Sequence, residues 1–523
     1  MPNIALSARR LSTLGGGSPS KAMLAGAGAV RRLQTQPHSP STAPPSPMSG
    51  MGMMGGRKPR PEGNIGSVFA SLSGEQEVVL PERFLDLKRE IIGSADNQAA
   101  LKAAWRTLIP RLAQRAEEAE IKQQGTIPTV SYDALLSGDE AAINRIKECG
   151  TAVVSGVVSE AEATGWLREL EEYIAANPQV NGFPTDDKQV FELYWSKPQL
   201  AARAHPRALA VQRALLGLFS LGAKGDDTEV SLAPLMYADR LRIRHPGDSR
   251  FALGPHMDGG SVERWEDPEY RAVYAKILSG QWEDYSAWEI GHRASAIQNM
   301  YEGPGACGVF RAFQGWTSMS DTGPGEGTLR VYPFLKEMTA YTLMRPLFKE
   351  KSPRSALTKE QYLSPENWEL DLETSAFPNA PPARSQEFND VSHPHLELSR
   401  SVVSIPRVRP GDQAWWHADV IHAVEPTHAG KGPSAVMYIP AVPVTAINAA
   451  YVRDQREAFE QRIPPPDFPG GVGEQGFKGT GTASDIVGLD ARRAVGLESL
   501  AIDPDLRHGG RVARETANKI FGF

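Results

Sequence analysis

Cysteine is scarce in this chain of 523 residues, and acidic side chains outnumber basic ones by 62 to 56. The two cysteines, Cys149 and Cys307, are too few for a disulfide framework and have no metal-type spacing, so we expect a reducing compartment and two buried thiols. No apolar run reaches the roughly 18 residues of a transmembrane helix, so no membrane span is expected. A net charge of −6 gives no reason to expect a nucleic-acid partner.

Acidic residues are absent from the first 61 positions, which carry eight Lys and Arg side chains. The rest of the chain carries 48 basic and 62 acidic side chains. Residues 1–70 are rich in Gly, Pro and Ser, which raises the entropic cost of ordering them, so we expect a disordered segment. Its composition is typical of a mitochondrial transit peptide; a tail without targeting value on a cytoplasmic protein is the alternative.

The strongest chemical signal is the sequence His256-Met257-Asp258. Alternate side chains on a strand share one face, so this imidazole and this carboxylate would point to the same side. A second apolar strand within residues 410–426 carries His422. Two imidazoles and one carboxylate can occupy one face of an Fe(II) ion and leave the opposite face open for reactants. We therefore predict a catalytic metal site formed by His256, Asp258 and His422.

Two other histidine elements could compete for a metal. His417 precedes His422 by five positions, so on an uninterrupted strand the two would face opposite ways, and we interpret His417 as a structural residue. The sequence His393-Pro394-His395 lies in a polar, proline-containing stretch, and we expect it to be exposed rather than metal-bound.

Helix signals lie on both sides of the predicted metal strands. Residues 81–92 and 94–123 are predicted helices, with Ser94 as the N-cap of the second. Residues 150–158 form a predicted strand, and Ser159 with Glu162 forms a capping box that opens a helix to about residue 176. Residues 335–400 contain proline clusters and indicate a long insertion between strands. Together these patterns predict an α+β domain over residues 71–523, with helical additions at both ends.

An ordered set of motifs resembles the Fe(II)/2-oxoglutarate-dependent oxygenases, and within them the phytanoyl-CoA hydroxylase-like branch. More narrowly, the chain resembles the YbiU-like family, whose function is unassigned. The wider resemblance is carried by His256-x-Asp258 and by residues 315–321, 327–333 and 411–422, and the narrower one by residues 237–240, 254–265, 313–316 and 436–440.

The resemblance implies a double-stranded β-helix, or jelly roll, as the core of residues 71–523. It implies Fe(II) and 2-oxoglutarate as cofactors, O₂ as a reactant and a small molecule as the substrate that is hydroxylated or otherwise oxidised. It also places Trp316 beside 2-oxoglutarate. Two alternatives stay open: a non-catalytic jelly-roll protein that binds metal or regulates, and a metal-dependent isomerase or hydrolase. The sequence gives no indication of the oligomeric state.

The chain departs from the wider family at one position. That family usually has an arginine, shortly after the distal histidine, that pairs with the distal carboxylate of 2-oxoglutarate, whereas residues 431–434 are Lys-Gly-Pro-Ser. A buried carboxylate without a partner is costly, so another group must take this position. Arg330 and Ser434 are our first candidates, and Arg244 and Arg311 stay open as replacements.

Residues 1–60, fused to a fluorescent reporter, are expected to direct the reporter to mitochondria. The physical reason is that an acid-free, arginine-bearing segment suits an import receptor and serves no evident purpose in a core. Fluorescence microscopy against a mitochondrial dye provides the measurement, and a diffuse cytosolic signal would contradict the prediction.

Overall fold

The computed structural model describes residues 69, 79–250, 252–303, 306–468 and 471–523. The chain divides into two units, Met1–Gly55 and Gly56–Phe523, and all described residues belong to the second. The predicted disorder and targeting signal of residues 1–68 lie outside the described residues, as does the predicted disorder of residue 70.

The two predicted N-terminal helices are confirmed as α3 (Arg83–Ile92) and α4 (Ala95–Lys122). The hydroxyl oxygen of Ser94 accepts a hydrogen bond from the backbone N–H of Asn97 at 3.3 Å, which caps α4 as predicted. The capping box of Ser159 and Glu162 likewise opens α7 (Glu160–Ala176). These local hydrogen bonds depend only on neighbouring residues, and for that reason the sequence identifies them.

The larger sheet has eight strands and is antiparallel except for the pair β1–β2. Its order is β1 (Thr129–Ser131), β2 (Thr151–Ser155), β14 (Gln413–His417), β8 (Phe313–Ser318), β16 (Ser434–Tyr438), β6 (Leu241–Arg244), β4 (Val190–Phe191) and β3 (Gly182–Phe183).

A second, fully antiparallel sheet has five strands, and two further sheets are two-stranded pairs. The five-stranded order is β12 (Gln386–Glu387), β7 (His256–Met257), β15 (His422–Val424), β9 (Leu329–Val331) and β13 (Val403–Ser404). The pairs are β10 (Phe348–Glu350) with β11 (Trp368–Leu370) and β5 (Ser231–Leu235) with β17 (Val442–Val444). Residues 335–400 lie between β9 and β13 in sequence, and within them β12 pairs with β7 of the same sheet.

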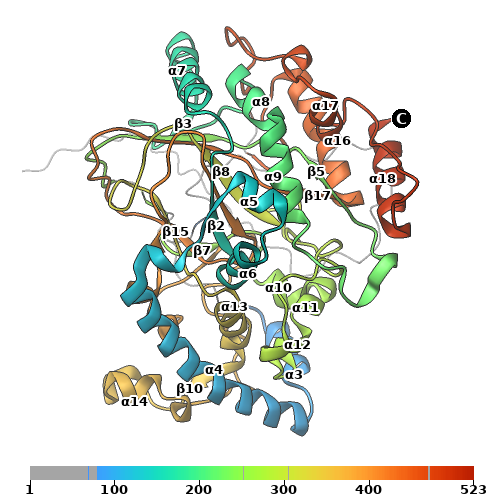
Figure 1. The fold of residues 1–523 in the computed structure, drawn as a ribbon. Helices are drawn as coiled ribbons and strands as arrows, with labels where there is room; N and C mark the ends of the chain where they lie inside the picture. Colours follow the sequence, from blue (N-terminus) through green and yellow to red (C-terminus); the bar gives the residue numbers. More distant parts are fainter. Residues whose placement is uncertain (1–68, 70–78, 251, 304–305, 469–470) are drawn as a thin grey trace, which may run out of the picture. The chain divides into compact units, whose positions relative to one another are not determined.

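Helices surround these sheets, and the mixed α+β class is confirmed. Figure 1 shows α17 beside α8 and α9, in agreement with its contacts, and α18 beside α16. The remaining helices are α5 (Tyr132–Ser137), α6 (Glu140–Cys149), α8 (Lys197–Ala204), α9 (Pro206–Leu216), α10 (Glu263–Glu266), α11 (Pro268–Val273), α12 (Ala275–Leu278), α13 (Leu335–Met344), α14 (Lys359–Leu363), α15 (Leu398–Ser401), α16 (Ala446–Gln461), α17 (Leu489–Ala494) and α18 (His508–Phe521).

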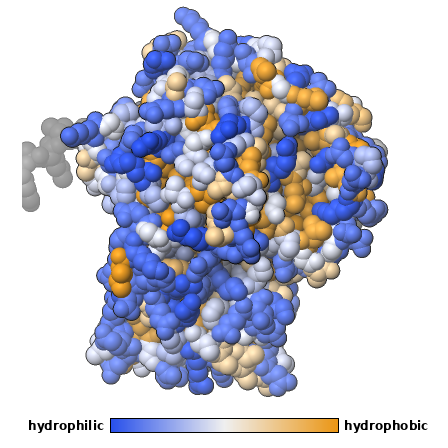
Figure 2. Space-filling view, in the orientation of Figure 1, coloured by the Kyte–Doolittle hydropathy of each residue, from blue (hydrophilic) through white to orange (hydrophobic). Residues whose placement is uncertain are grey.

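The surface of the described part is mixed in character. On the face drawn in Figure 2, hydrophilic residues predominate and hydrophobic ones lie between them. None of the helices in the described ranges is both long enough and apolar enough to cross a membrane. Both cysteines are buried as expected, and burial raises the pKa of each thiol to about 12.

The expectation that His393 and His395 are exposed is wrong. Both side chains are buried, because α4 and α13 cover the segment that the sequence suggested was a loop. The Tyr341 hydroxyl lies 3.1 Å from Nδ1 of His395, and the Trp105 and His395 rings meet edge to face at 5.3 Å. Packing against two helices that are distant in sequence causes this burial, and no local sequence pattern predicts it.

Acidification is expected to destabilise the fold through its buried histidines. Burial lowers the pKa of His395 and His417 to about 3, and lowers that of His393 well below its ordinary value. As pH falls below about 6.5, the unfolded chain takes up protons at these positions and the folded chain does not. The free energy of unfolding should therefore fall between pH 6.5 and about pH 4, by at most about 1.4 kcal/mol per pH unit for each histidine.

Urea unfolding followed by circular dichroism at pH 7.5, 6 and 5, with a chelator present, provides the measurement. The variant His245→Gln, which alters an exposed imidazole, is the control and should keep the same pH dependence. A free energy of unfolding that stays level or rises from pH 7.5 to pH 5 would contradict this reading of the core.

Candidate metal centre

The two predicted histidine ligands are direct cross-strand neighbours. Strands β7 and β15 pair antiparallel with His256 opposite His422, and their ring centroids lie 4.1 Å apart. Directly opposed residues point to the same face of a sheet, so this register brings both imidazoles to one side. Two residues far apart in sequence thus form one site through a single ladder position.

Backbone carbonyls fix the orientation of both imidazoles. Nδ1 of His256 lies 2.7 Å from the carbonyl oxygen of Gly254, and Nδ1 of His422 lies 3.1 Å from that of Val420. Donation of the Nδ1 proton to these carbonyls leaves the Nε2 lone pairs for a ligand. Both Nε2 atoms face Asp258, and aromatic rings flank the pair: Phe69 meets His256 edge-on at 4.8 Å, and Trp416 lies 5.1 Å from His422.

Asp258 completes the group from just beyond the end of β7. Its carboxylate oxygens lie 3.8 Å from Nε2 of His256 and 3.7 Å from Nε2 of His422. Ligand atoms about 2.1 Å from one ion on adjacent vertices would lie roughly 3 Å apart, so a small contraction would suffice to bind one. Among the described residues, these three form the group that could hold a metal ion.

The backbone after Asp258 favours glycine at the next two positions. Gly259 and Gly260 have φ angles of 76° and 91°, in the left-handed region that favours glycine. A Cβ atom on Gly260 would also lie 2.8 Å from the carbonyl oxygen of Gln298. This turn carries the chain away from the sheet immediately after the carboxylate.

The surroundings of Asp258 and of His422 lower the pKa of both groups. Burial opposes ionisation of Asp258, but His256, His422 and Arg311 together lower its pKa to about 2. Burial lowers the pKa of His422 to about 3, and the neighbouring His256 adds to this shift. Neutral imidazoles and an ionised carboxylate are the forms that bind metal ions.

Both ends of β15 are anchored by buried charges. Before the strand, Arg293 donates to both carboxylate oxygens of Asp419, at 3.2 and 2.5 Å, and Tyr274 donates at 2.9 Å. After the strand, the carboxylate of Glu425 accepts backbone N–H groups from Gly325, Gly327 and Thr328 at 2.8–3.1 Å. A strand of three residues is therefore held in register by contacts at both of its ends.

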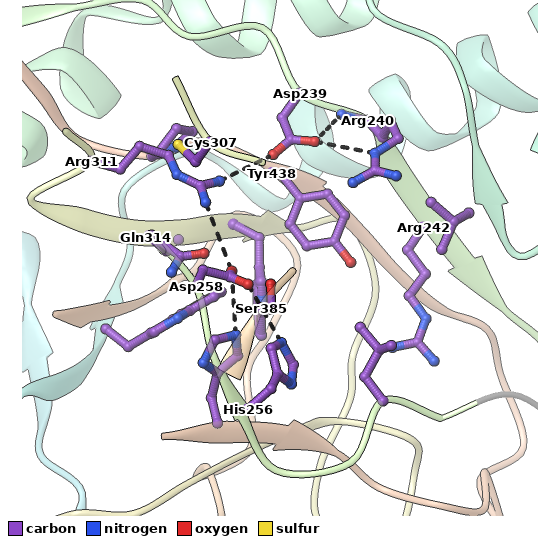
Figure 3. A pocket seen from close by; sticks show the side chains of 18 of the residues that line it. Asp239, Arg240, Arg242, His256, Asp258, Cys307, Arg311, Gln314, Ser385 and Tyr438 are labelled. Carbon is purple, nitrogen blue, oxygen red and sulfur yellow. Dashed lines mark hydrogen bonds and ion pairs between the residues drawn. The ribbon is translucent and has the colours of Figure 1, made fainter. Parts of the chain in front are cut away.

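A cavity of about 180 Å³ opens onto these three side chains. Residues two apart on β8 and β16 line it, as strand alternation requires. Val436 pairs with Ser318 on one side and with Arg242 of β6 on the other. Figure 3 shows Arg242 and Tyr438 facing the same space as His256 and Asp258. The inward residues of the sheet are Gln314, Trp316, Ser318, Ser434, Val436, Tyr438 and Arg242.

Four of the sequence-predicted residues can now be placed relative to this cavity. Trp316 and Ser434 line it. Arg330 does not: its strand neighbour Leu329 does, so Arg330 points to the other face of β9 and its guanidinium donates to the carbonyl of Val402. His417 is in the core, with Nε2 3.1 Å from the carbonyl of Ala287 and Nδ1 accepting from the N–H of Asp419.

The sequence analysis missed Arg242 as a cavity residue. Its position was nevertheless readable, because residues 237–244 alternate in character as a strand does, and positions 240, 242 and 244 of such a strand share one face. What the sequence lacked was the identity of the neighbouring strand. The pairing of β6 with β16 places Arg242 opposite Val436, close to Ser434.

The fold and the site together define a mixed α+β protein with a candidate His-Asp-His metal centre. The Gig2-like family profile matches residues 78–497, so the chain belongs to the Gig2-like family. YbiU, an uncharacterized protein of Escherichia coli K12, is 32% identical over 398 residues, which cover 73% of this chain and 89% of YbiU. The YbiU-like resemblance is thereby confirmed.

Two crystal structures of relatives share the fold. GlcNAc Inducible Gene 2 from Candida albicans has a TM-score of 0.77 and 31% identity, with 86% of this chain and 97% of the relative covered. A protein of Salmonella typhimurium LT2, provisionally named an oxidoreductase, has a TM-score of 0.67 and 29% identity, with 80% and 99% covered.

Replacing His422 with alanine is expected to abolish metal binding, whereas His417→Ala is expected to retain it. Loss of one of three ligands should lower affinity by more than the roughly 10–100-fold that loss of an outer partner costs. Metal content after dialysis against Fe(II) under argon, measured by mass spectrometry, tests both variants, with circular dichroism as the check on folding. The reverse pattern would show that the third ligand has been wrongly chosen.

Proposed function

We propose that this protein is an Fe(II)- and 2-oxoglutarate-dependent oxygenase that oxidises a small molecule. The observation that carries the proposal is the orientation of His256 and His422, whose Nε2 atoms and the Asp258 carboxylate converge on one cavity. A set of two imidazoles and one carboxylate with open positions is the donor set of non-haem Fe(II) oxygenases. The pairing of His256 with His422 and the cavity beside them are both consistent with that chemistry.

In this proposal the bound iron and 2-oxoglutarate would supply the oxidising chemistry. Overall, O₂, 2-oxoglutarate and a substrate C–H bond give succinate, CO₂ and a C–OH group. The protein contributes orientation and exclusion of water. Trp316 and Trp416 wall the cavity beside the ligands, and Tyr438 stands between the ligands and Arg242 in Figure 3.

Arg242 is the residue that we assign to the distal carboxylate of 2-oxoglutarate. It takes over this assignment from Arg330, which lies outside the cavity lining. The Arg242 side chain is buried, and burial lowers the pKa of its guanidinium, so an anion beside it would offset a desolvation cost. Ser434 lines the cavity from the adjacent strand and adds a hydroxyl donor. In this proposal Arg242 of β6 takes the role of the arginine that the wider family has shortly after its distal histidine.

We read the two larger sheets as the two halves of a jelly roll. Both contribute to one cavity, with β8, β16 and β6 on one side and β7, β9 and β15 on the other. A ligand cavity between such sheets is a common arrangement in this architecture. The position of Arg242 favours the catalytic reading over a non-catalytic metal-binding protein, because it offers the co-substrate a partner.

The variant Arg242→Gln is expected to weaken 2-oxoglutarate binding by at least about tenfold, because a charge-assisted bidentate contact is lost. Calorimetry with the anaerobic Fe(II)-loaded protein measures the affinity, and succinate release in air measures turnover. The matched control is Arg330→Gln, which removes a guanidinium outside the cavity and should leave both values unchanged. Absence of 2-oxoglutarate binding to the unaltered protein would sink the proposal and favour the non-catalytic alternative.

A further inference from the structure

Arg311 presents unused hydrogen-bond donors beside the metal centre. Its side chain lies just before β8, lines the cavity and is 13% exposed. The nearest acidic oxygens are those of Asp258 at 3.8 Å and Asp239 at 3.9 Å. Both distances exceed the roughly 3.2 Å limit of a good N–H···O hydrogen bond. Within the described part of the chain, the guanidinium of Arg311 thus makes long ion pairs, lies 5.5 Å from the centre of the Tyr237 ring and makes no hydrogen bond.

A second arginine, Arg240, lies on the same part of the cavity wall. Arg240 approaches the other oxygen of Asp239, with its Nε atom at 3.5 Å, and its guanidinium lies 4.8 Å from the centre of the Phe468 ring. Figure 3 shows Asp239 between the two arginines, with the Arg311 guanidinium directed from Asp239 toward Asp258. The Asp239 carboxylate thus lies between two guanidinium groups on the cavity wall.

We infer that the substrate of the proposed oxygenase is a small carboxylic acid whose carboxylate binds Arg311, with Arg240 adding attraction. The oxidation of this acid rests on the proposed function, whereas the binding of its carboxylate to Arg311 does not. The planar fork of arginine matches a carboxylate with two parallel hydrogen bonds. A phosphate dianion fits less well, because Asp239 and Asp258 lie on either side and would repel the second charge.

The position of Arg311 also limits which carbon is oxidised. Because its guanidinium is 3.8 Å from a carboxylate oxygen of Asp258, an acid held there lies immediately beside the metal ligands. The C–H bonds nearest to the centre are therefore those close to the carboxylate. Compact acids suit this geometry better than long ones.

Binding of isobutyrate and isobutyramide tests the inference without knowledge of the substrate. The two probes have the same shape and differ in charge, and ligand-observed NMR measures their affinity for the full-length protein in the presence of a chelator. Isobutyrate is expected to bind at least about tenfold more tightly than isobutyramide and more tightly than inorganic phosphate. Equal binding of acid and amide, or tighter binding of phosphate, would overturn the inference.

Variants then locate the bound acid. Arg311→Gln should weaken isobutyrate binding by at least about tenfold, and Arg311→Lys should weaken it less because the charge stays while the fork is lost. Arg330→Gln should leave it unchanged, and Arg242→Gln should weaken it less than Arg311→Gln does. Loss through Arg242→Gln with none through Arg311→Gln would overturn the inference.

The comparison of isobutyrate with isobutyramide uses the unaltered protein. It therefore tests the inference even when Arg311→Gln does not fold. The proposed function is tested separately, by the dependence of 2-oxoglutarate binding on Arg242. Carboxylate binding that depends on Arg311 in a protein without 2-oxoglutarate binding would uphold this inference and refute the oxygenase proposal.

Discussion

The pairing of His256 with His422 across β7 and β15 is the constraint on which the rest of the site depends. Strand side chains alternate between faces, so a register shift of one residue in either strand would turn its histidine away from the cavity. The pairing also aligns the carbonyls of Gly254 and Val420, two positions before each histidine, with the Nδ1 atoms. A single ladder position therefore sets the location, the orientation and the free nitrogen of both imidazoles.

Such short strands cannot hold this register by their own ladder hydrogen bonds, and buried charges at the ends of β15 supply what is missing. The Arg293–Asp419 pair fixes the turn before β15. Glu425, which follows β15, binds the backbone of the loop 325–328. Isolated buried charges are costly, but these carboxylates are satisfied by several donors each. Burying these two carboxylates costs free energy, and in return β15 is held rigidly at a site where a misplacement of about 1 Å would matter.

The sequence predicted what local periodicity controls and missed what spatial neighbours control. His256 and Asp258 followed from strand alternation, and the helix caps at Ser94 and Ser159 followed from hydrogen bonds within one turn. Arg330 was assigned to the cavity without knowledge of which face of β9 turns inward. Arg242 was overlooked because its relation to Ser434 exists only through the pairing of β6 with β16. The burial of His393 and His395 depends on helices more than 40 positions away in sequence.

The edge-on contact of Phe69 with His256 bears on where the folded domain begins. Phe69 is buried, and it packs with Val190, Phe183 and Leu253 on the side of the cavity that holds the metal ligands. A domain boundary drawn at residue 71 from composition would keep all three ligands and every strand of both large sheets. It would nevertheless remove the aromatic ring that packs edge-on against His256. Shortened versions of this chain should therefore be judged by how well they shield their imidazoles from solvent, and not by whether they fold.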